Sequence, residues 1–170
     1  MEFMELIQAR YSCKKYNGEA VPAEKLAAIL EAGRLAPTAK NTQEHHVYVA
    51  QSAEVLAKID AVTPCRYNAP TVLVVCGNKK LAFTYPGGAA TACAEDATIV
   101  ATHLMLAAAD QGVQSCWVNF FNPAELAAAL GLPEDEEIVM LLDLGYAAED
   151  GVALPNHFSR KPIDETVSYL

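Results

Sequence analysis

Thr71-Val-Leu-Val-Val-Cys76 is the stretch of this sequence that decides the fold. A continuous apolar run of this length, rich in β-branched residues, is typical of a strand that is buried on both faces. Such a strand needs a layer of helices on each side of its sheet. The run therefore predicts a three-layer domain that combines strands with helices.

The segments on either side of this strand supply the expected helices and strands. Apolar periodicity and turn residues predict helices over 2–10, 22–35, 52–59, 88–111 and 122–131. Further strands are expected over 47–50, 115–120 and 138–144, and the polar stretch 38–45 is expected to be a loop. Pro22 is expected as the first residue of its helix. This order of elements predicts an α/β or α+β domain.

The predicted helix over 88–111 is rich in alanine and ends at Gly112. Its small side chains make it thin, so that another helix can approach closely. Two interpretations remain open. The helix lies in the core of one domain, or it forms the seam of a dimer.

Composition limits the classes of function. The chain has 170 residues, 52% of them hydrophobic, and 12 Lys and Arg against 21 Asp and Glu give a net charge of −9. This length and apolar content predict a single domain over 1–170 with a real core, and they exclude a disordered chain. The negative charge argues against a general nucleic-acid-binding protein. No stretch has the length and low charge of a membrane span.

The cysteines and the start of the chain indicate a compartment. Five cysteines, an odd number without a C-x-x-C pair, indicate free thiols rather than disulfides or a structural zinc site. Acidic residues follow Met1 where a signal peptide needs basic ones. We therefore expect a protein of the reducing cytoplasm.

Common catalytic and nucleotide-binding motifs are missing from the sequence. There is no G-x-G-x-x-G after a strand, no P-loop, no G-x-S-x-G elbow and no H-E-x-x-H. His45 and His46 are adjacent, so on a strand they would point to opposite faces and would not easily share a metal ion. An enzyme with this sequence is expected to rely on a cofactor for its chemistry.

Two cationic stretches are candidates for binding a phosphate. In an extended segment Arg10, Ser12 and Lys14 would point the same way, and two cations with a hydroxyl suit a phosphate monoester. Arg160 and Lys161 in the C-terminal tail would add to this charge. The alternative is that these cations are favourable helix-end or surface charges without a ligand.

Two further stretches offer polar and aromatic groups. The loop 36–43 is rich in amides and hydroxyls that suit the edge of a heterocycle, although turn chemistry alone selects the same residues. The stretch 112–119 places Trp117, the single tryptophan of the sequence, on a strand that follows a helix stop. That position suits a planar ligand, and it equally suits a tryptophan of the core.

Together and in this order, the four stretches resemble the nitroreductase family of flavin enzymes. That family has R-R/H-S-x-R/K near the N-terminus, then A-P-S-x-x-N-x-Q-P-W, then G-L/V-x-S-C-W after a helix, and a late R-K-P-L. The matching stretches here are 10–14, 36–43, 112–117 and 160–163. The sequence departs from the pattern at Glu44 and His45, which replace Pro-Trp, and at Phe120, which replaces a glycine.

The resemblance implies an α+β fold: a nitroreductase-like three-layer domain with a mostly antiparallel mixed sheet flanked by helices, paired as an intertwined homodimer. It implies one FMN at each dimer interface, no metal, and a C-terminal tail that wraps the partner. The residues implied to bind FMN are Arg10, Tyr11, Ser12, Lys14, Pro37, Thr38, Ala39, Asn41, Trp117, Val118, Asn119, Arg160 and Lys161. Those of the loop would come from the other subunit. No side chain is implied to be catalytic, because the flavin N5 carries the chemistry.

The activity implied by this resemblance is that of an FMN-dependent oxidoreductase. NADH or NADPH would be the donor, and a nitroaromatic, quinone or similar electron-poor small molecule the acceptor, in ping-pong order. The implied partners are a second copy and a small-molecule acceptor, with no nucleic acid and no membrane.

Three alternatives remain open. One is a different flavin reaction on the same fold, such as dehalogenation or heterocycle oxidation. Another is an FMN-binding protein without catalysis, in which Phe120 plugs the flavin face. The last is thiol redox chemistry at Cys13 or Cys116.

Overall fold

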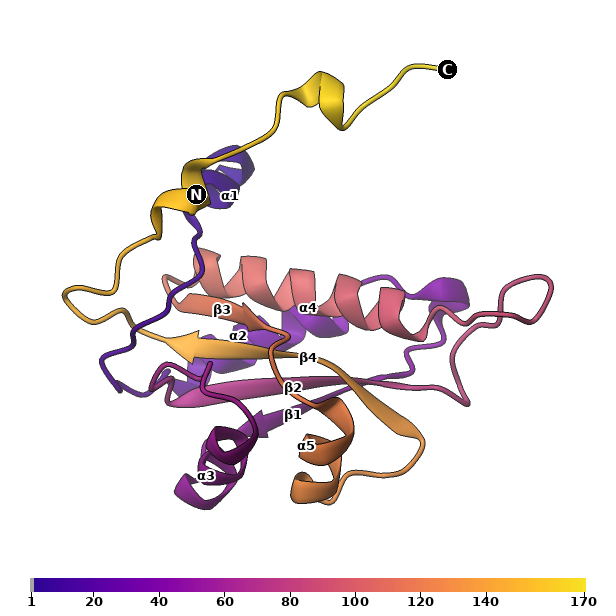
Figure 1. Ribbon diagram of the computed structural model, residues 1–170, viewed down its shortest axis with the longest axis horizontal. Helices are drawn as coiled ribbons and strands as arrows, with labels where there is room; N and C mark the ends of the chain where they lie inside the picture. Colours follow the sequence, from indigo (N-terminus) through magenta and orange to yellow (C-terminus); the bar gives the residue numbers. More distant parts are fainter. Residues whose placement is uncertain (1) are drawn as a thin grey trace.

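The structure of the protein, a computed structural model, describes residues 2–170. Its strands form an antiparallel sheet in the order β1-β2-β4-β3 (Figure 1). The strands are β1 (His45–Ala50), β2 (Thr71–Asn78), β3 (Gln114–Val118) and β4 (Glu136–Gly145). The α-helices are α1 (Phe3–Ala9), α2 (Ala23–Arg34), α3 (Ala53–Val62), α4 (Cys93–Asp110) and α5 (Pro123–Leu130). Short 3-10 helices are η1 (Ala39–Asn41), η2 (Pro155–Phe158) and η3 (Ile163–Glu165).

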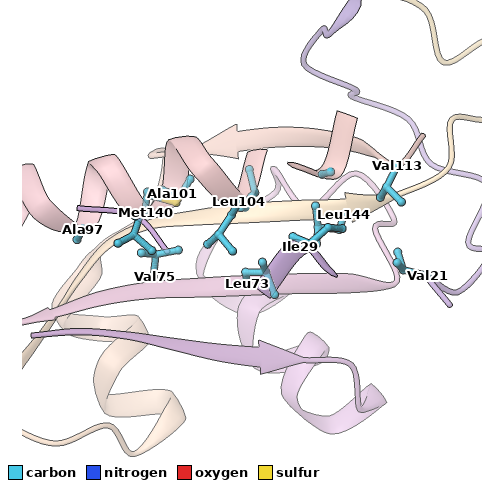
Figure 2. Packing of buried hydrophobic residues seen from close by; sticks show 14 residues of the cluster. Val21, Ile29, Leu73, Val75, Ala97, Ala101, Leu104, Val113, Met140 and Leu144 are labelled. Atoms are coloured by element: carbon cyan, nitrogen blue, oxygen red, sulfur yellow. The ribbon is translucent and has the colours of Figure 1, made fainter. Parts of the chain in front are cut away.

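Helices cover both faces of the sheet, as the apolar run predicts. α2 and α4 lie on one face, and α3 and α5 on the other (Figure 1). β2 is buried over Thr71–Gly77, and its side chains alternate between two cores. Leu73 and Val75 pack on the α4 side (Figure 2), whereas Val72 and Val74 pack on the α3 and α5 side. The prediction of a three-layer α+β domain is confirmed.

α4 is a core helix, and α2 of the same chain covers its small residues. Gly33 of α2 lies so close that a Cβ atom there would come within 2.6 Å of a methyl carbon of Leu104. Ala97 and Ala101 have no exposed surface and pack into the same core (Figure 2). The close approach predicted for this thin helix is therefore made within one chain. The outward face of α4, around Ile99, remains exposed.

The predicted start of the long helix is wrong. α4 begins at Cys93 rather than at residue 88. Before it, Thr84 and Thr91 pair as an antiparallel bridge around Gly87 and Gly88, whose φ angles of 97° and 73° lie outside the helical region. The alanine-rich pattern extends into this turn, but the glycine pair prevents the helix from starting there.

Other boundaries also differ from the prediction. β1 begins at His45 rather than at residue 47, and β4 spans Glu136–Gly145 rather than 138–144. The remaining differences concern β3 and α2. β3 ends at Val118 rather than at residue 120, because the chain turns and the N–H of Phe121 donates to the carbonyl of Asn119 at 3.0 Å. Pro22 is the residue before the first helical residue of α2, not the first one. In each case the error is two residues or fewer, and the element itself is where the pattern predicts it.

Local capping signals are confirmed where the sequence contains them. The Ser52 hydroxyl accepts the N–H of Val55 at 3.3 Å and begins α3, which continues to Val62. The Asn122 side chain accepts two backbone N–H groups in the first turn of α5.

The segment after α1 runs along the free edge of β3. Ser12 forms a parallel bridge with Ser115, and the N–H of Cys13 donates to the carbonyl of Ser115 at 2.9 Å. Tyr16 forms an antiparallel bridge with Ala147 further on. The sheet is therefore mostly antiparallel with one parallel contact, and the N-terminal segment is extended, as expected.

The C-terminal tail leaves the body of the molecule. Residues 158–170 are exposed throughout, and the chain end extends beyond α1, away from the sheet (Figure 1). Several of these exposed side chains are large and apolar, including Ile163 and Tyr169. From residue 2 to the C-terminal end, the structure contains no helix with the length and apolar character needed to cross a membrane.

Candidate functional site

The N-terminal extended segment brings Ser12 and Lys14 to one polar cavity. Because the segment pairs with β3, alternate side chains point the same way, and Cys13 between them is fully buried on the opposite side. Ser12 and Lys14 line a cavity of about 170 Å³. The other lining residues are Leu154, Asn156 and His157 of the loop around η2.

Arg10 and Tyr11 lie next to this cavity rather than in it. They line a separate cavity of about 210 Å³ between α1 and the C-terminal end of α4, together with Gly112 and Ser115. The Tyr11 hydroxyl donates to the carbonyl of Gly151 at 2.7 Å. That bond holds the loop before η2 across the N-terminal segment, so two distant parts of the sequence meet here (Figure 1).

The charges at this place are unbalanced. The guanidinium of Arg10 is half-buried, and burial together with the neighbouring Arg160 lowers the pKa of Arg10. No ion pair within the described chain involves Arg10, Lys14 or Arg160. Arg160 instead donates to the carbonyls of His157 and Ser159, the latter at 2.7 Å.

Elsewhere the protein pairs most of its cations with carboxylates. The basic residues within 4.0 Å of a carboxylate are Lys15, Arg34, Lys58, Arg66, Lys79, Lys80 and Lys161. Lys161 is thus directed to Glu165 of its own tail, at 3.7 Å, and not to the candidate site. Within residues 2–170, Lys25 and Lys40 also lack a carboxylate, but their ammonium groups lie over the rings of Tyr146 and Phe83. The other three cations without a carboxylate there are Arg10, Lys14 and Arg160, which lie around the two cavities and which we call the cationic patch.

The loop that contains Pro37 and Thr38 has a strained backbone. Lys40, Asn41 and Gln43 have φ angles of 53°, 56° and 52°, a region that residues other than glycine adopt rarely. The sequence correctly predicts a polar loop here, because these residues suit turns. It does not predict the strain, which accompanies hydrogen bonds within the loop and bonds from the loop to Asp96 and Glu44.

The loop and the cationic patch lie at opposite ends of α4. The N–H of Ala39 donates to the Asp96 carboxylate, at 3.0 Å from each oxygen, in the first turn of the helix. Arg10 shares its cavity with Ala109 in the last turn. An 18-residue helix is about 27 Å long. One chain therefore does not bring these two groups of predicted residues together.

The stretch around Trp117 presents backbone groups at the sheet edge. Trp117 packs partly into the α4-side core, whereas Val118 is buried on the other face. The Ser115 carbonyl accepts the N–H of Cys13, so it points away from β4 and toward the free edge of the sheet. Residues two apart on a strand direct their backbone groups to the same side, so the N–H and carbonyl of Trp117 also point to that edge. The Trp117 Nε1–H donates to the Asn119 side-chain oxygen at 2.6 Å, which fixes the Asn119 side chain.

Two alternatives from the sequence find no support in the geometry. Phe120 is 73% exposed, so in one chain it covers nothing. Cys13 and Cys116 are buried, and burial raises the pKa of both thiols, that of Cys116 to about 12. Buried thiols of this kind are poor nucleophiles. In the part of the chain that the structure describes, no group of side chains could hold a metal ion.

Sequence reasoning missed the residues that the tail contributes. Leu154, Asn156 and His157 complete the smaller cavity, but the irregular tail has no periodicity or motif that marks them. It also missed Glu44, which the sequence places in a polar loop and which is only 4% exposed. The signal that the sequence offered was the departure from the family pattern, because Glu44 stands where that pattern has a proline.

Comparison with known proteins identifies a single family. The sequence model of the nitroreductase family matches residues 7–65 and 64–146. A protein of Archaeoglobus fulgidus with the provisional name NADH dehydrogenase/NAD(P)H nitroreductase is 30% identical over 156 residues, which cover 88% of this chain and 87% of the relative.

Solved structures show the same fold. A nitroreductase family protein from Clostridium difficile superposes with a TM-score of 0.93 at 35% identity, covering 99% of this chain and 98% of that one. A protein of Exiguobacterium sibiricum, provisionally named a nitroreductase and solved in complex with FMN, has a TM-score of 0.84 at 22% identity. The alignment covers 100% of this chain and 98% of that one.

Proposed function

The chain belongs to the nitroreductase family, and from that premise we propose that it is an FMN-dependent oxidoreductase. NADH or NADPH would be its electron donor, in line with the name of the Archaeoglobus fulgidus relative. The acceptor would be a nitroaromatic, a quinone or a similar electron-poor small molecule.

The cationic patch carries this proposal. An FMN phosphate has a charge of about −2 near neutral pH and three acceptor oxygens. Arg10, Lys14 and Arg160 have no carboxylate to neutralise them within the described chain, and Ser12 adds a hydroxyl at the cavity wall. The residues present therefore fit a phosphate monoester, because charge-assisted hydrogen bonds would replace the repulsion between Arg10 and Arg160.

A second copy of the chain would complete the site. The loop with Pro37, Thr38, Ala39 and Asn41 lies at the opposite end of α4 from the patch, and α4 is about 27 Å long, so these residues would reach the flavin of the partner. A homodimer would also cover the exposed apolar side chains of the tail. One domain over residues 1–170 would then contribute to two sites.

The chain itself would bind, orient and shield, while the bound flavin would supply hydride transfer at its N5. Trp117 directs backbone groups to the open sheet edge, and its indole N–H holds the Asn119 side chain in place for a polar contact with the ring system. Tyr11 keeps the tail loop over the phosphate-binding segment. Donor and acceptor would use one open face and bind in turn, which is a ping-pong order.

Absorbance of the purified protein, with the released cofactor identified by mass, tests the proposal. We expect oxidised-flavin bands that bleach on addition of NADH or NADPH. Arg10→Ala should weaken FMN binding by about 1.5–3 kcal/mol through loss of a charge-assisted bond. Arg34→Ala, which removes an exposed cation paired with Glu31, is the matched control and should retain FMN. A colourless monomer that takes up no FMN from excess would overturn the proposal.

A further inference from the structure

The strained loop 38–43 is held by two carboxyl groups from different elements. Asp96, in the first turn of α4, accepts the N–H of Ala39 on both oxygens at 3.0 Å. Glu44, directly before β1, accepts the Thr42 hydroxyl at 2.6 Å. Each end of the loop is therefore bound to a carboxyl group. The left-handed residues Lys40 and Asn41 lie between the two bonds, and the left-handed Gln43 directly follows the second.

These two carboxyl groups are buried against each other. Glu44 is 4% exposed and Asp96 is 3% exposed, and the Glu44 carboxyl lies within hydrogen-bonding reach of the Asp96 carboxyl. Glu44 Oε1 is buried without a hydrogen-bond partner among residues 2–170. Two interacting carboxyl groups in a buried place do not both ionise at little cost, and a proton shared between them would give Glu44 Oε1 a partner.

The backbone under the pair is rigid. The Glu44 carbonyl accepts the N–H of Asn78 in β2 at 3.0 Å, which fixes Glu44 to the sheet. A Cβ atom on Gly77 would come within 2.5 Å of the Cys93 sulfur, so the first turn of α4 lies directly on β2. Sheet and helix thus fix the backbone that carries the two carboxyl groups, and the loop is bonded to both of them.

We propose that Glu44 and Asp96 share one proton, and that this shared proton holds the loop 38–43 in its strained conformation. When the proton leaves, the two buried carboxylates repel each other and move apart. The loop can then no longer keep its bond from Ala39 to Asp96 and its bond from Thr42 to Glu44 at the same time. Glu44 and Asp96 are positioning residues, because they act through the loop and not on a ligand. Their effect on flavin binding rests on the function proposed above, but their effect on the loop does not.

The neighbouring charges favour retention of the proton. Burial first, and then the Glu44 carboxyl, raise the pKa of Asp96 against the opposing effect of the Ala39 N–H. Glu95 on α4 acts in the same direction. Further titratable groups beside the pair are Cys93, His45 and Tyr85, whose hydroxyl donates to Glu95. The Nζ atom of Lys40 in the loop lies 4.6 Å from the centre of the Phe83 ring, and Lys40 pairs with neither acid.

The direction of the pH dependence follows from the sign of this shift. A carboxyl group with a raised pKa in the folded state stabilises it below its ordinary value of about 3.8, and that stabilisation is lost as pH rises through the raised value. The loop should therefore be held tightly at low pH and loosen as pH rises. FMN held by the loop should dissociate faster at high pH.

Amide exchange in the protein without added cofactor tests the loop directly. The protection factor of the Ala39 N–H, corrected for intrinsic exchange, should fall by about tenfold for each pH unit once pH has risen through the raised pKa of Asp96. Glu44→Gln places an amide donor against Asp96 at every pH. In this variant the protection factor of the Ala39 N–H should therefore stay constant as pH rises. Asp96→Asn places an amide donor against the Glu44 carboxyl instead, and this variant is used if Glu44→Gln does not fold. Glu54→Gln, an exposed carboxyl on α3, is the control and should follow the unmodified protein.

The rate of FMN release over the same pH range is the second measurement. It should rise with pH in the unmodified protein and in Glu54→Gln, and stay flat in Glu44→Gln. A constant protection factor in the unmodified protein, or one that falls equally in Glu44→Gln, overturns the shared proton. If the protein binds no FMN, the proposed function fails, and the exchange measurement still decides the role of the pair.

Discussion

Asp143 is buried in β4 under conditions that penalise its charge. It is 1% exposed, and both carboxyl oxygens lack a hydrogen-bond partner in the part of the chain that is described. Burial raises the pKa of Asp143 to about 9, and the nearby Arg66 offsets this only in part. The Arg66 guanidinium is already occupied by Asp60 and by the carbonyl of Ala69.

The protein must therefore bind a proton at Asp143 when it folds at neutral pH. In the unfolded chain Asp143 has its ordinary pKa of about 3.8 and is ionised at pH 7. About three pH units at about 1.4 kcal/mol each give a cost of about 4 kcal/mol at pH 7. Because the pKa is raised in the folded state, this cost is absent below pH 4 and grows until pH reaches about 9.

Asp143→Asn should remove this cost, since the amide is neutral and nearly the same size. We expect the free energy of unfolding to exceed that of the unmodified protein by about 4 kcal/mol at pH 7 and by less than about 2 kcal/mol at pH 5. Urea denaturation at several pH values measures the difference. Glu149→Gln, at an exposed position, is the control and should give no comparable gain. Stability curves of Asp143→Asn and the unmodified protein that run parallel across pH would refute the reasoning.

The other predictions concern stability and assembly. Ser52→Ala removes the acceptor for the Val55 N–H and should lower the free energy of unfolding by about 1 kcal/mol in urea titrations. Gly33→Ala places a methyl group 2.6 Å from Leu104 and should lower thermal stability by an amount equivalent to about 1–3 kcal/mol, whereas an unchanged melting temperature would show that α2 can shift. Ile99→Asp puts a charge on the exposed face of α4, and light scattering should then show the monomer mass if a second copy packs there.

Local sequence predicts the elements of this fold well where a short-range cause exists. β2 follows from six consecutive residues that no solvent-facing strand would carry, and α3 follows from the Ser52 cap. The errors occur where two local preferences compete. The alanine pattern before Cys93 favours a helix, but Gly87 and Gly88 turn the chain first.

Local sequence also predicts which residues of the candidate site carry charge or polar groups. The alternation of Arg10, Ser12 and Lys14 requires only an extended segment, and β3 imposes one through Ser115. The sequence does not predict that Lys161 pairs with Glu165, or that Asn156 and His157 line the cavity. Those facts depend on where the tail lies.

The sequence by itself determined the helices, the central strand and the family pattern, because hydrogen bonding and burial over a few residues act through neighbours along the chain. Only the tertiary structure decided which charged groups are left without a partner. Arg10 lacks an acid, and Glu44 meets Asp96, because segments far apart in the sequence pack together. The energy of a charge depends on all the groups and the solvent around it, and these are defined only once the chain has folded.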